Sequence, residues 1–162
     1  MSGGTKKTAD DGEGSSGSPS SAGIFVVLQF TGIFFQFIAA DYSEPSWWPV
    51  VVFGGGGILL LIYTLVHNRL GNFAIHPMPL ASAALITSGP YKFIRHPMYA
   101  SAILVMTGLI TGCFSLGALI GFAIMMAGLA GKMKIEESAL LVKFSEYREY
   151  MKKTRRLIPG LF

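Results

Sequence analysis

The sequence predicts an all-α polytopic membrane protein with about four transmembrane helices and a C-terminal amphipathic cytoplasmic helix. Of its 162 residues, 51% are hydrophobic and only 14% are charged, which is too little charge for an ordinary soluble domain. Three runs, 23–40, 47–66 and 100–131, contain no Asp, Glu, Lys, Arg or His. Because a bilayer core of about 30 Å takes about 20 helical residues, each of the first two runs fits one span.

The membrane domain is expected to cover 23–162, with its first spans at about 23–40 and 47–67. Residues 1–22 precede it as a disordered polar tail, because Gly, Ser, Thr and Asp leave almost nothing apolar to bury. A cleaved signal peptide would place basic residues directly before a shorter apolar core, whereas the two lysines of the tail lie far from the first apolar run. We therefore interpret that run as a retained span.

The third apolar run is too long for one span, since as a single helix it would extend roughly 48 Å. A hairpin that breaks within 112–117, with spans at about 97–112 and 115–134, is the better prediction. The alternative is one long tilted helix, which would give three spans in all.

A C-terminal helix is predicted over 136–153. Leu140, Phe144, Tyr147 and Met151 recur at helical spacing, while charged residues occupy the other faces. This pattern is typical of an amphipathic helix that lies against the membrane surface or the cytoplasmic ends of the spans.

Loop charges predict the orientation, because cytoplasmic loops carry an excess of Lys and Arg. The 41–46 linker holds two acidic residues and no cation, and the 112–117 turn holds no charge, so both are expected outside. Lysines and arginines concentrate in 67–96 and in the C-terminal tail. We therefore expect a multi-pass integral membrane protein with both termini in the cytoplasm, in a bacterial inner membrane or the endoplasmic reticulum.

The formal net charge of +4 does not indicate a nucleic-acid partner, because the cations lie where topology and anionic lipid head groups would place them. Membrane lipids are the expected surroundings, and no obligate protein partner is inferred. Cys113 is the single cysteine, and His67, His76 and His96 lack the spacing of a metal site. No metal is therefore expected.

Glycines recur inside the apolar runs. The block 54–57 is all glycine, and two pairs are spaced by four residues: Gly108 with Gly112 and Gly117 with Gly121. In lipid such residues allow helix backbones to approach closely. They indicate either plain helix packing, which we favour for each pair, or a groove that admits a lipid-like or cofactor group.

Residues 88–101, SGPYKFIRHPMYAS, gather polar groups directly before an apolar run. The SGP tripeptide is turn chemistry, and Pro97 suits the first position of a helix. The free N–H groups and the positive end of the helix dipole at that position would bind an anion. Arg95 and His96 beside it are candidate site residues or, alternatively, interfacial anchors.

The hairpin brings a second polar group, Glu136 and Glu137, to the same side of the membrane. A cation-binding pair of carboxylates near an anion-binding helix start would fit a zwitterionic ligand. Alternatively, the two glutamates are solvated charges in the first turn of the last helix.

The blocks GPYKFIRHPMY and EESALLVKFSEYREYMKKTRRLIP, with an uncharged hairpin between them, resemble the isoprenylcysteine carboxyl methyltransferase family and its phospholipid N-methyltransferase relatives. The resemblance covers roughly 70–159, more than half of the chain. It implies an S-adenosylmethionine-dependent methyltransferase that binds its cofactor at the cytoplasmic helix ends and acts on a lipophilic small-molecule or prenylated substrate. The implied cofactor-binding residues are Leu85, Ile86, Tyr91, His96, Pro97, Met98, Tyr99, Glu136 and Glu137. Lys132 corresponds to a family residue tied to substrate.

Four features depart from the family pattern. Ala83 stands where many relatives carry a histidine, Ser101 where glycine is usual, and the FSEYREY block is shortened. Lys132 replaces a frequent arginine and loses bidentate geometry toward a carboxylate.

The implied reaction is an in-line displacement at a sulfonium, which depends on positioning and on excluding water. A carboxylate acceptor, as in carboxyl O-methylation of an isoprenylcysteine-like substrate, arrives ionised and needs only Lys132 or Arg95 to orient it. An amine or thiol acceptor, as in phospholipid N-methylation or thiol S-methylation, would need His96 or Tyr99 as a base. Arg95, His96 and Tyr99 are therefore the candidate catalytic residues, and carboxyl O-methylation is the preferred prediction.

Carboxylates directly against the sulfonium would stabilise the ground state more than the transition state, where its charge fades. Glu136 and Glu137 are therefore expected to hold the amino or ribose groups of the cofactor. Two other classes of function stay open. One is an NADPH-dependent sterol-reductase-like oxidoreductase, which shares an R-H-P-x-Y-like element, and the other is a non-catalytic membrane scaffold.

Overall fold

The computed structural model describes residues 19–68 and 84–160. Its α-helices are α1 (Pro19–Ala39), α2 (Trp47–Pro49), α3 (Gly55–His67), α4 (Pro97–Gly112), α5 (Leu116–Lys143) and α6 (Tyr147–Lys153). A π-helical turn, η1 (Val50–Gly54), joins α2 to α3, and a 3-10 turn, η2 (Gly89–Lys92), precedes α4. Across the described ranges no strand forms, and an isolated parallel bridge links Ile94 to Arg155. The predicted all-α fold class is confirmed.

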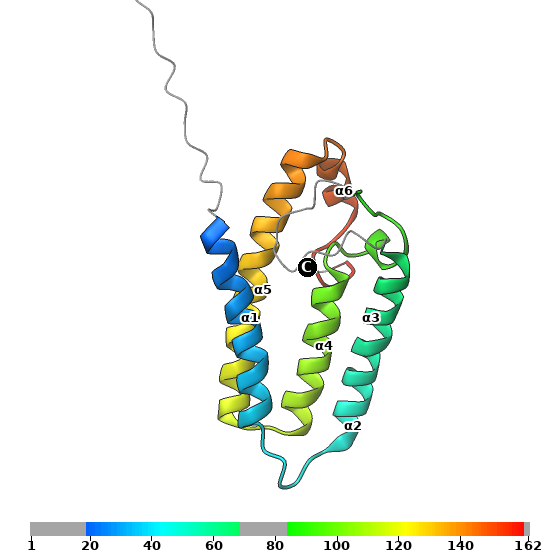
Figure 1. The fold of residues 1–162 in the computed structure, drawn as a ribbon. Helices are drawn as coiled ribbons and strands as arrows, with labels where there is room; N and C mark the ends of the chain where they lie inside the picture. Colours follow the sequence, from blue (N-terminus) through cyan, green and yellow to red (C-terminus); the bar gives the residue numbers. More distant parts are fainter. Residues whose placement is uncertain (1–18, 69–83, 161–162) are drawn as a thin grey trace, which may run out of the picture.

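Two pairs of helical rods make up the bundle (Figure 1). One pair is α1 with α5, and the other is α4 with the rod that α2, η1 and α3 form together. This rod runs from Trp47 to His67, the predicted second span. The first helix begins before the predicted span, because residues 19–22 of the expected tail are already helical, whereas its apolar part, Ala22–Ala39, is close to the predicted 23–40. The rest of that tail, His76 and Ala83 lie outside the described residues.

Three rods are long and apolar enough to cross a membrane: Ala22–Ala39, Trp47–His67 and Leu116–Lys143. The fourth, α4, is apolar but has 16 residues. The 100–131 run is thus a hairpin broken between α4 and α5, and the alternative of one long tilted helix is wrong. This architecture agrees with the prediction of about four spans.

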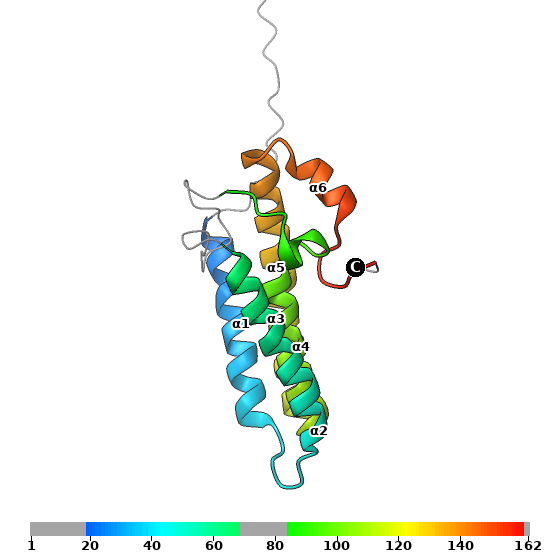
Figure 2. The same cartoon turned by 90° about the vertical axis from the view of Figure 1, so that its right-hand side faces the viewer.

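The predicted helix over 136–153 is wrong as a single element. Its first part is the end of α5, which has 28 residues and extends about 42 Å, so it exceeds a bilayer core of about 30 Å. Phe144 is extended (φ −121°, ψ 115°), and α6 then turns back (Figure 2). There the Tyr150 hydroxyl donates a hydrogen bond to the carbonyl of Tyr91 at 2.7 Å. A straight helix would carry Tyr150 away from this partner.

Glycines set the distance between the rods. A Cβ on Gly121 would lie 2.6 Å from the backbone N of Gln36, and a Cβ on Gly108 would lie 3.0 Å from that of Gly54. The close approach of α1 to α5 and of η1 to α4 therefore needs residues without side chains. Plain packing accounts for these glycines.

The two turns predicted outside the membrane lie together at one end of the bundle. The N–H of Ser46 donates to the carbonyl of Gly112 at 2.8 Å, and the N–H of Asp41 donates to that of Cys113 at 3.3 Å. Ser115 caps α5 by accepting a hydrogen bond from the N–H of Ala118 at 2.9 Å. The opposite end holds the start of α4, the last turns of α5 and α6 (Figure 1).

Candidate active site

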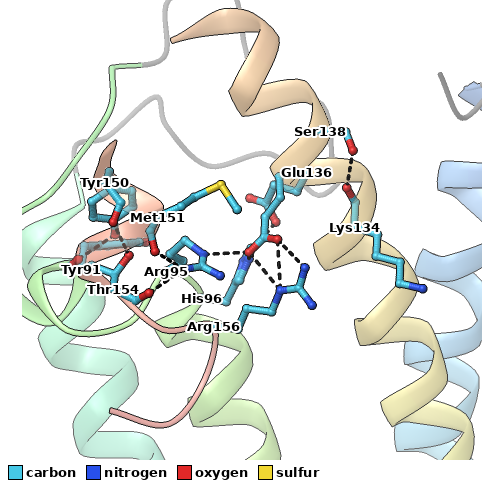
Figure 3. Close-up of polar contacts among 11 residues, drawn as sticks. Tyr91, Arg95, His96, Lys134, Glu136, Ser138, Tyr150, Met151, Thr154 and Arg156 are labelled. Carbon is cyan, nitrogen blue, oxygen red and sulfur yellow. Dashed lines mark hydrogen bonds and ion pairs between the residues drawn. The ribbon is translucent and has the colours of Figure 1, made fainter. Parts of the chain in front are cut away.

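The polar end of the α4–α5 hairpin is the candidate site (Figure 3). His96 precedes the first residue of α4, and Glu136 and Glu137 lie on α5. The Nε2 atom of His96 is 3.2 Å from Oε1 of Glu137, and its Nδ1 atom is 3.6 Å from Oε2 of Glu136. The imidazole ring therefore lies between the two carboxylates, as the predicted hairpin requires.

Glu137 is the centre of a buried ionic network, with 4% of its surface exposed. Arg95 Nε donates to its Oε1 at 2.8 Å, and Arg156 donates to its Oε2 from Nη2 at 2.8 Å and from Nε at 3.0 Å. These hydrogen bonds to Glu137 raise the pKa of Arg156. A buried carboxylate is stable only when it is paired in this way. Both oxygens of Glu137 are therefore committed within the protein.

Glu136 is less buried than Glu137, because 33% of its side-chain surface is exposed. Its Oε2 atom accepts a hydrogen bond from the Tyr99 hydroxyl at 2.9 Å. Among the described residues, its Oε1 atom has no hydrogen bond or ion pair. One oxygen of this carboxylate is therefore not used in contacts among the described residues.

Tyr99 connects His96 to Lys132. The His96 and Tyr99 rings are stacked, with centroids 5.3 Å apart and planes 5° from parallel. The Nζ atom of Lys132 lies 5.1 Å from the Tyr99 ring centroid and donates to Oε1 of Gln29 on α1 at 2.8 Å. Lys132 is 5% exposed, so a buried cation has a neutral amide as its hydrogen-bond partner.

The segment after α6 pairs with the segment before α4. The N–H of Arg95 donates to the carbonyl of Arg155 at 2.7 Å, and the N–H of His96 donates to that of Arg156 at 3.0 Å. The Arg95 guanidinium also donates to the carbonyl of Thr154 at 2.7 Å. Arg95 therefore ties three segments together: its own, the C-terminal segment and α5.

Three tyrosines, Tyr91, Tyr147 and Tyr150, lie near these contacts of Arg95. Burial, with a contribution from the negative charge of Glu136, raises the pKa of Tyr91 to about 12. Burial also raises the pKa of Tyr150, whose hydroxyl bonds to the Tyr91 carbonyl. Tyr147 is 1% exposed, and among the described residues its hydroxyl has no hydrogen-bond partner.

The remaining predicted residues lie next to these groups in the chain. Leu85 and Ile86 are half-buried in the irregular segment before η2. Pro97 is buried at the first position of α4, as predicted, and Met98 follows it half-buried. Within the described residues, no group of three or more His, Cys, Asp or Glu side chains could hold a metal ion.

Sequence reasoning missed Gln29, Tyr147 and Arg156 as site residues. Gln29 had a usable signal, because a polar residue inside an apolar span usually faces the protein interior. Tyr147 was interpreted only as part of an apolar helical stripe, and Arg156 only as one of many tail cations. Neither pattern reveals that α6 and the tail fold back onto η2 and the segment before α4.

Two comparisons with known proteins found similar sequences. The model of the Isoprenylcysteine carboxyl methyltransferase (ICMT) family matches residues 50–142. The "Cobalt-zinc-cadmium resistance protein CzcN" of Cupriavidus metallidurans is 33% identical over 81 residues, which are 48% of this chain and 36% of that relative. The matched part therefore spans about a third of the relative's length. The family match leaves out α1, α6 and the tail, and with them the three residues that sequence reasoning missed.

Proposed function

The chain belongs to the isoprenylcysteine carboxyl methyltransferase family, and we propose on that basis that it is an integral membrane S-adenosylmethionine-dependent methyltransferase with a lipophilic acceptor. The observation that carries the proposal is the meeting of His96, Tyr99 and Glu136 at one end of the α4–α5 hairpin. This is the end that the loop charges assign to the cytoplasm. Both termini are proposed to lie on that side.

The residues present fit the cofactor. Glu136 offers a partly exposed carboxylate with one uncommitted oxygen, beside the stacked rings of His96 and Tyr99. That oxygen can accept hydrogen bonds from an ammonium or a ribose hydroxyl. When bound, S-adenosylmethionine supplies an electrophilic methyl group on a sulfonium. The residues proposed to contact it are Leu85, Ile86, Tyr91, His96, Pro97, Met98, Tyr99 and Glu136.

Glu137 and Arg95 have a different proposed role. Because both oxygens of Glu137 are bound by cationic side chains, it holds His96 and the C-terminal segment in place and does not contact the cofactor. Arg95 is likewise proposed as a positioning residue, since its guanidinium ties the C-terminal segment to α5.

Lys132 supports an anionic acceptor. Within the described residues, the hydrogen-bond partner of the buried Lys132 ammonium is the neutral amide of Gln29, and the carboxylate of an isoprenylcysteine-like acceptor would supply an anionic partner in direct contact. Lys132 would orient this carboxylate for attack on the methyl carbon. The methyl group would come from the sulfonium of S-adenosylmethionine, which would leave as a neutral thioether, and no proton would have to be removed from the already ionised carboxylate.

Methyl transfer from labelled S-adenosylmethionine tests the proposal. Membranes containing the protein are incubated with a prenylcysteine, phosphatidylethanolamine and a thiol, and each acceptor is counted. Label in the prenylcysteine that alkali releases as methanol is expected, because a methyl ester is hydrolysed by base. Label in phosphatidylethanolamine or in the thiol would replace the carboxylate acceptor with an amine or a thiol.

The variant Glu136→Gln is expected to lower transfer at limiting cofactor at least tenfold, because it removes the charge that would bind the ammonium. Glu149→Gln is the matched control, since Glu149 is 64% exposed and pairs with Lys152 on the surface of α6. Folded wild-type protein that binds no S-adenosylmethionine would overturn the proposal.

A further inference from the structure

Tyr147 is a buried polar residue near the polar end of the α4–α5 hairpin. It is 1% exposed, and its hydroxyl has no hydrogen-bond partner among the described residues. Burying a hydroxyl without a partner costs about 1–3 kcal/mol in proteins. Such a group is either a defect of the packing or one half of an interaction that a ligand completes.

The surroundings of Tyr147 are those of the proposed site. Its ring lies against that of Tyr150, with centroids 5.6 Å apart. Burial raises the pKa of Tyr147, the charges of Glu137 and Glu136 raise it further, and the charge of Arg95 lowers it. The helix that carries Tyr147 also reaches the site through Met151, whose carbonyl accepts a hydrogen bond from the Arg95 guanidinium at 3.3 Å. The raised pKa keeps the Tyr147 hydroxyl protonated at neutral pH. A neutral phenol of this kind can donate one hydrogen bond.

The polar groups around it are already paired. Tyr150 donates to the Tyr91 carbonyl, Tyr99 donates to Glu136, and both oxygens of Glu137 accept from arginines. Within the described residues, the groups of this network left without a hydrogen-bond partner are the buried Tyr147 hydroxyl and the partly exposed Oε1 atom of Glu136. A packing defect is an unconvincing explanation, because phenylalanine would fill the same space without the cost of the oxygen.

We propose that the Tyr147 hydroxyl is a ligand-binding group of the active site, which donates a hydrogen bond to an oxygen of S-adenosylmethionine. This inference rests on the proposed function and extends the site to α6, outside the part of the chain that the family model matches. The acceptor oxygen belongs either to the carboxylate or to the ribose of the cofactor. Glu136 and Tyr147 would then hold donor and acceptor groups of one ligand.

The test is Tyr147→Phe, which removes only the oxygen. Its dissociation constant for S-adenosylmethionine, measured by calorimetry on detergent-solubilised protein, is expected to rise about tenfold, as for the loss of one hydrogen bond. The melting temperature of the cofactor-free variant is expected to be unchanged or higher, since no bond of the free protein is lost. An unchanged dissociation constant would overturn the proposal, and so would a fall in the cofactor-free melting temperature.

Tyr150→Phe is the matched control, because it removes a hydroxyl that is already bonded to the chain. It is expected to lower the cofactor-free melting temperature while changing the dissociation constant less than threefold. Decarboxylated S-adenosylmethionine then identifies the acceptor oxygen. If that oxygen is in the carboxylate, Tyr147→Phe and wild type bind this analogue equally, and if it is in the ribose the tenfold difference persists. Wild-type protein that binds neither compound would overturn the proposed function itself.

Discussion

The two ends of the α4–α5 hairpin are built from different interactions. The closed end is the one with the turn between α4 and α5 and the 41–46 linker, and the open end is the polar end that holds the candidate site. At the closed end, helices meet through glycine contacts and backbone hydrogen bonds such as that from Ser46 to Gly112. At the open end, Arg95, His96 and Arg156 converge on Glu137. The closed end thus depends on shape, whereas the open end depends on charge.

This difference separates structural roles from functional ones. A packing contact between glycines is complete in the protein alone. The open end contains both completed pairs, as at Glu137, and groups with unused hydrogen-bonding capacity, as at Glu136 and Tyr147. Substitutions at the closed end should therefore change stability alone, whereas those at the open end should change stability, cofactor binding or both, according to whether the group is already paired.

The largest effect is expected from Glu137→Gln. It leaves two guanidiniums and His96 around a neutral amide, and breaking a buried ion pair in this way costs about 3–5 kcal/mol. The free energy of unfolding in mixed micelles should fall by that amount. The dissociation constant of S-adenosylmethionine should also rise, because His96 and the C-terminal segment lose their anchor.

Glu136→Gln is the comparison for this variant. Its carboxylate is 33% exposed and carries one strong hydrogen bond, from Tyr99, so its removal should cost less than half as much stability while weakening cofactor binding more directly. Equal stability losses for the two variants would show that Glu137 is not the structural centre of the open end.

The next effect is at the closed end. Gly121→Ala places a Cβ at 2.6 Å from the backbone N of Gln36, so α1 and α5 must separate, at a cost of roughly 1–3 kcal/mol. Gly55→Ala is the control, because a Cβ there has no neighbour within 4 Å and alanine favours a helix. Relative to wild type, the free energy of unfolding should fall for Gly121→Ala and rise for Gly55→Ala. Cofactor affinity should be unchanged in both, and a change would mean that the ends are coupled.

The sequence allowed the closed end to be predicted better than the open end. Uncharged runs and glycine spacing depend on local composition, so the spans, the hairpin and the packing could be derived from them. The position of His96 relative to Glu136 followed from topology alone. The contacts of Glu137 and Arg95 with the C-terminal segment could not, because that segment and α6 fold back after an interruption at Phe144. That interruption is stabilised by contacts more than 50 positions away in the chain, such as the bond from Tyr150 to Tyr91.

The smallest effect is expected at Gln36, a polar residue in the last turn of α1, near the closed end. It is fully buried, and its Nε2 atom donates to the carbonyl of Met106 at 2.7 Å, linking α1 to α4. Among the described residues its Oε1 atom has no partner, which offsets part of the gain. Hydrogen bonds between membrane helices average about 0.6 kcal/mol, so Gln36→Leu should lower the free energy of unfolding by no more than about 1 kcal/mol. Because Gln36 bonds to none of the open-end residues, cofactor affinity should stay within twofold of wild type. A larger loss of affinity would mean that the cofactor binds between the helix pairs and not only at the open end. The separation of packing at the closed end from chemistry at the open end would then be wrong.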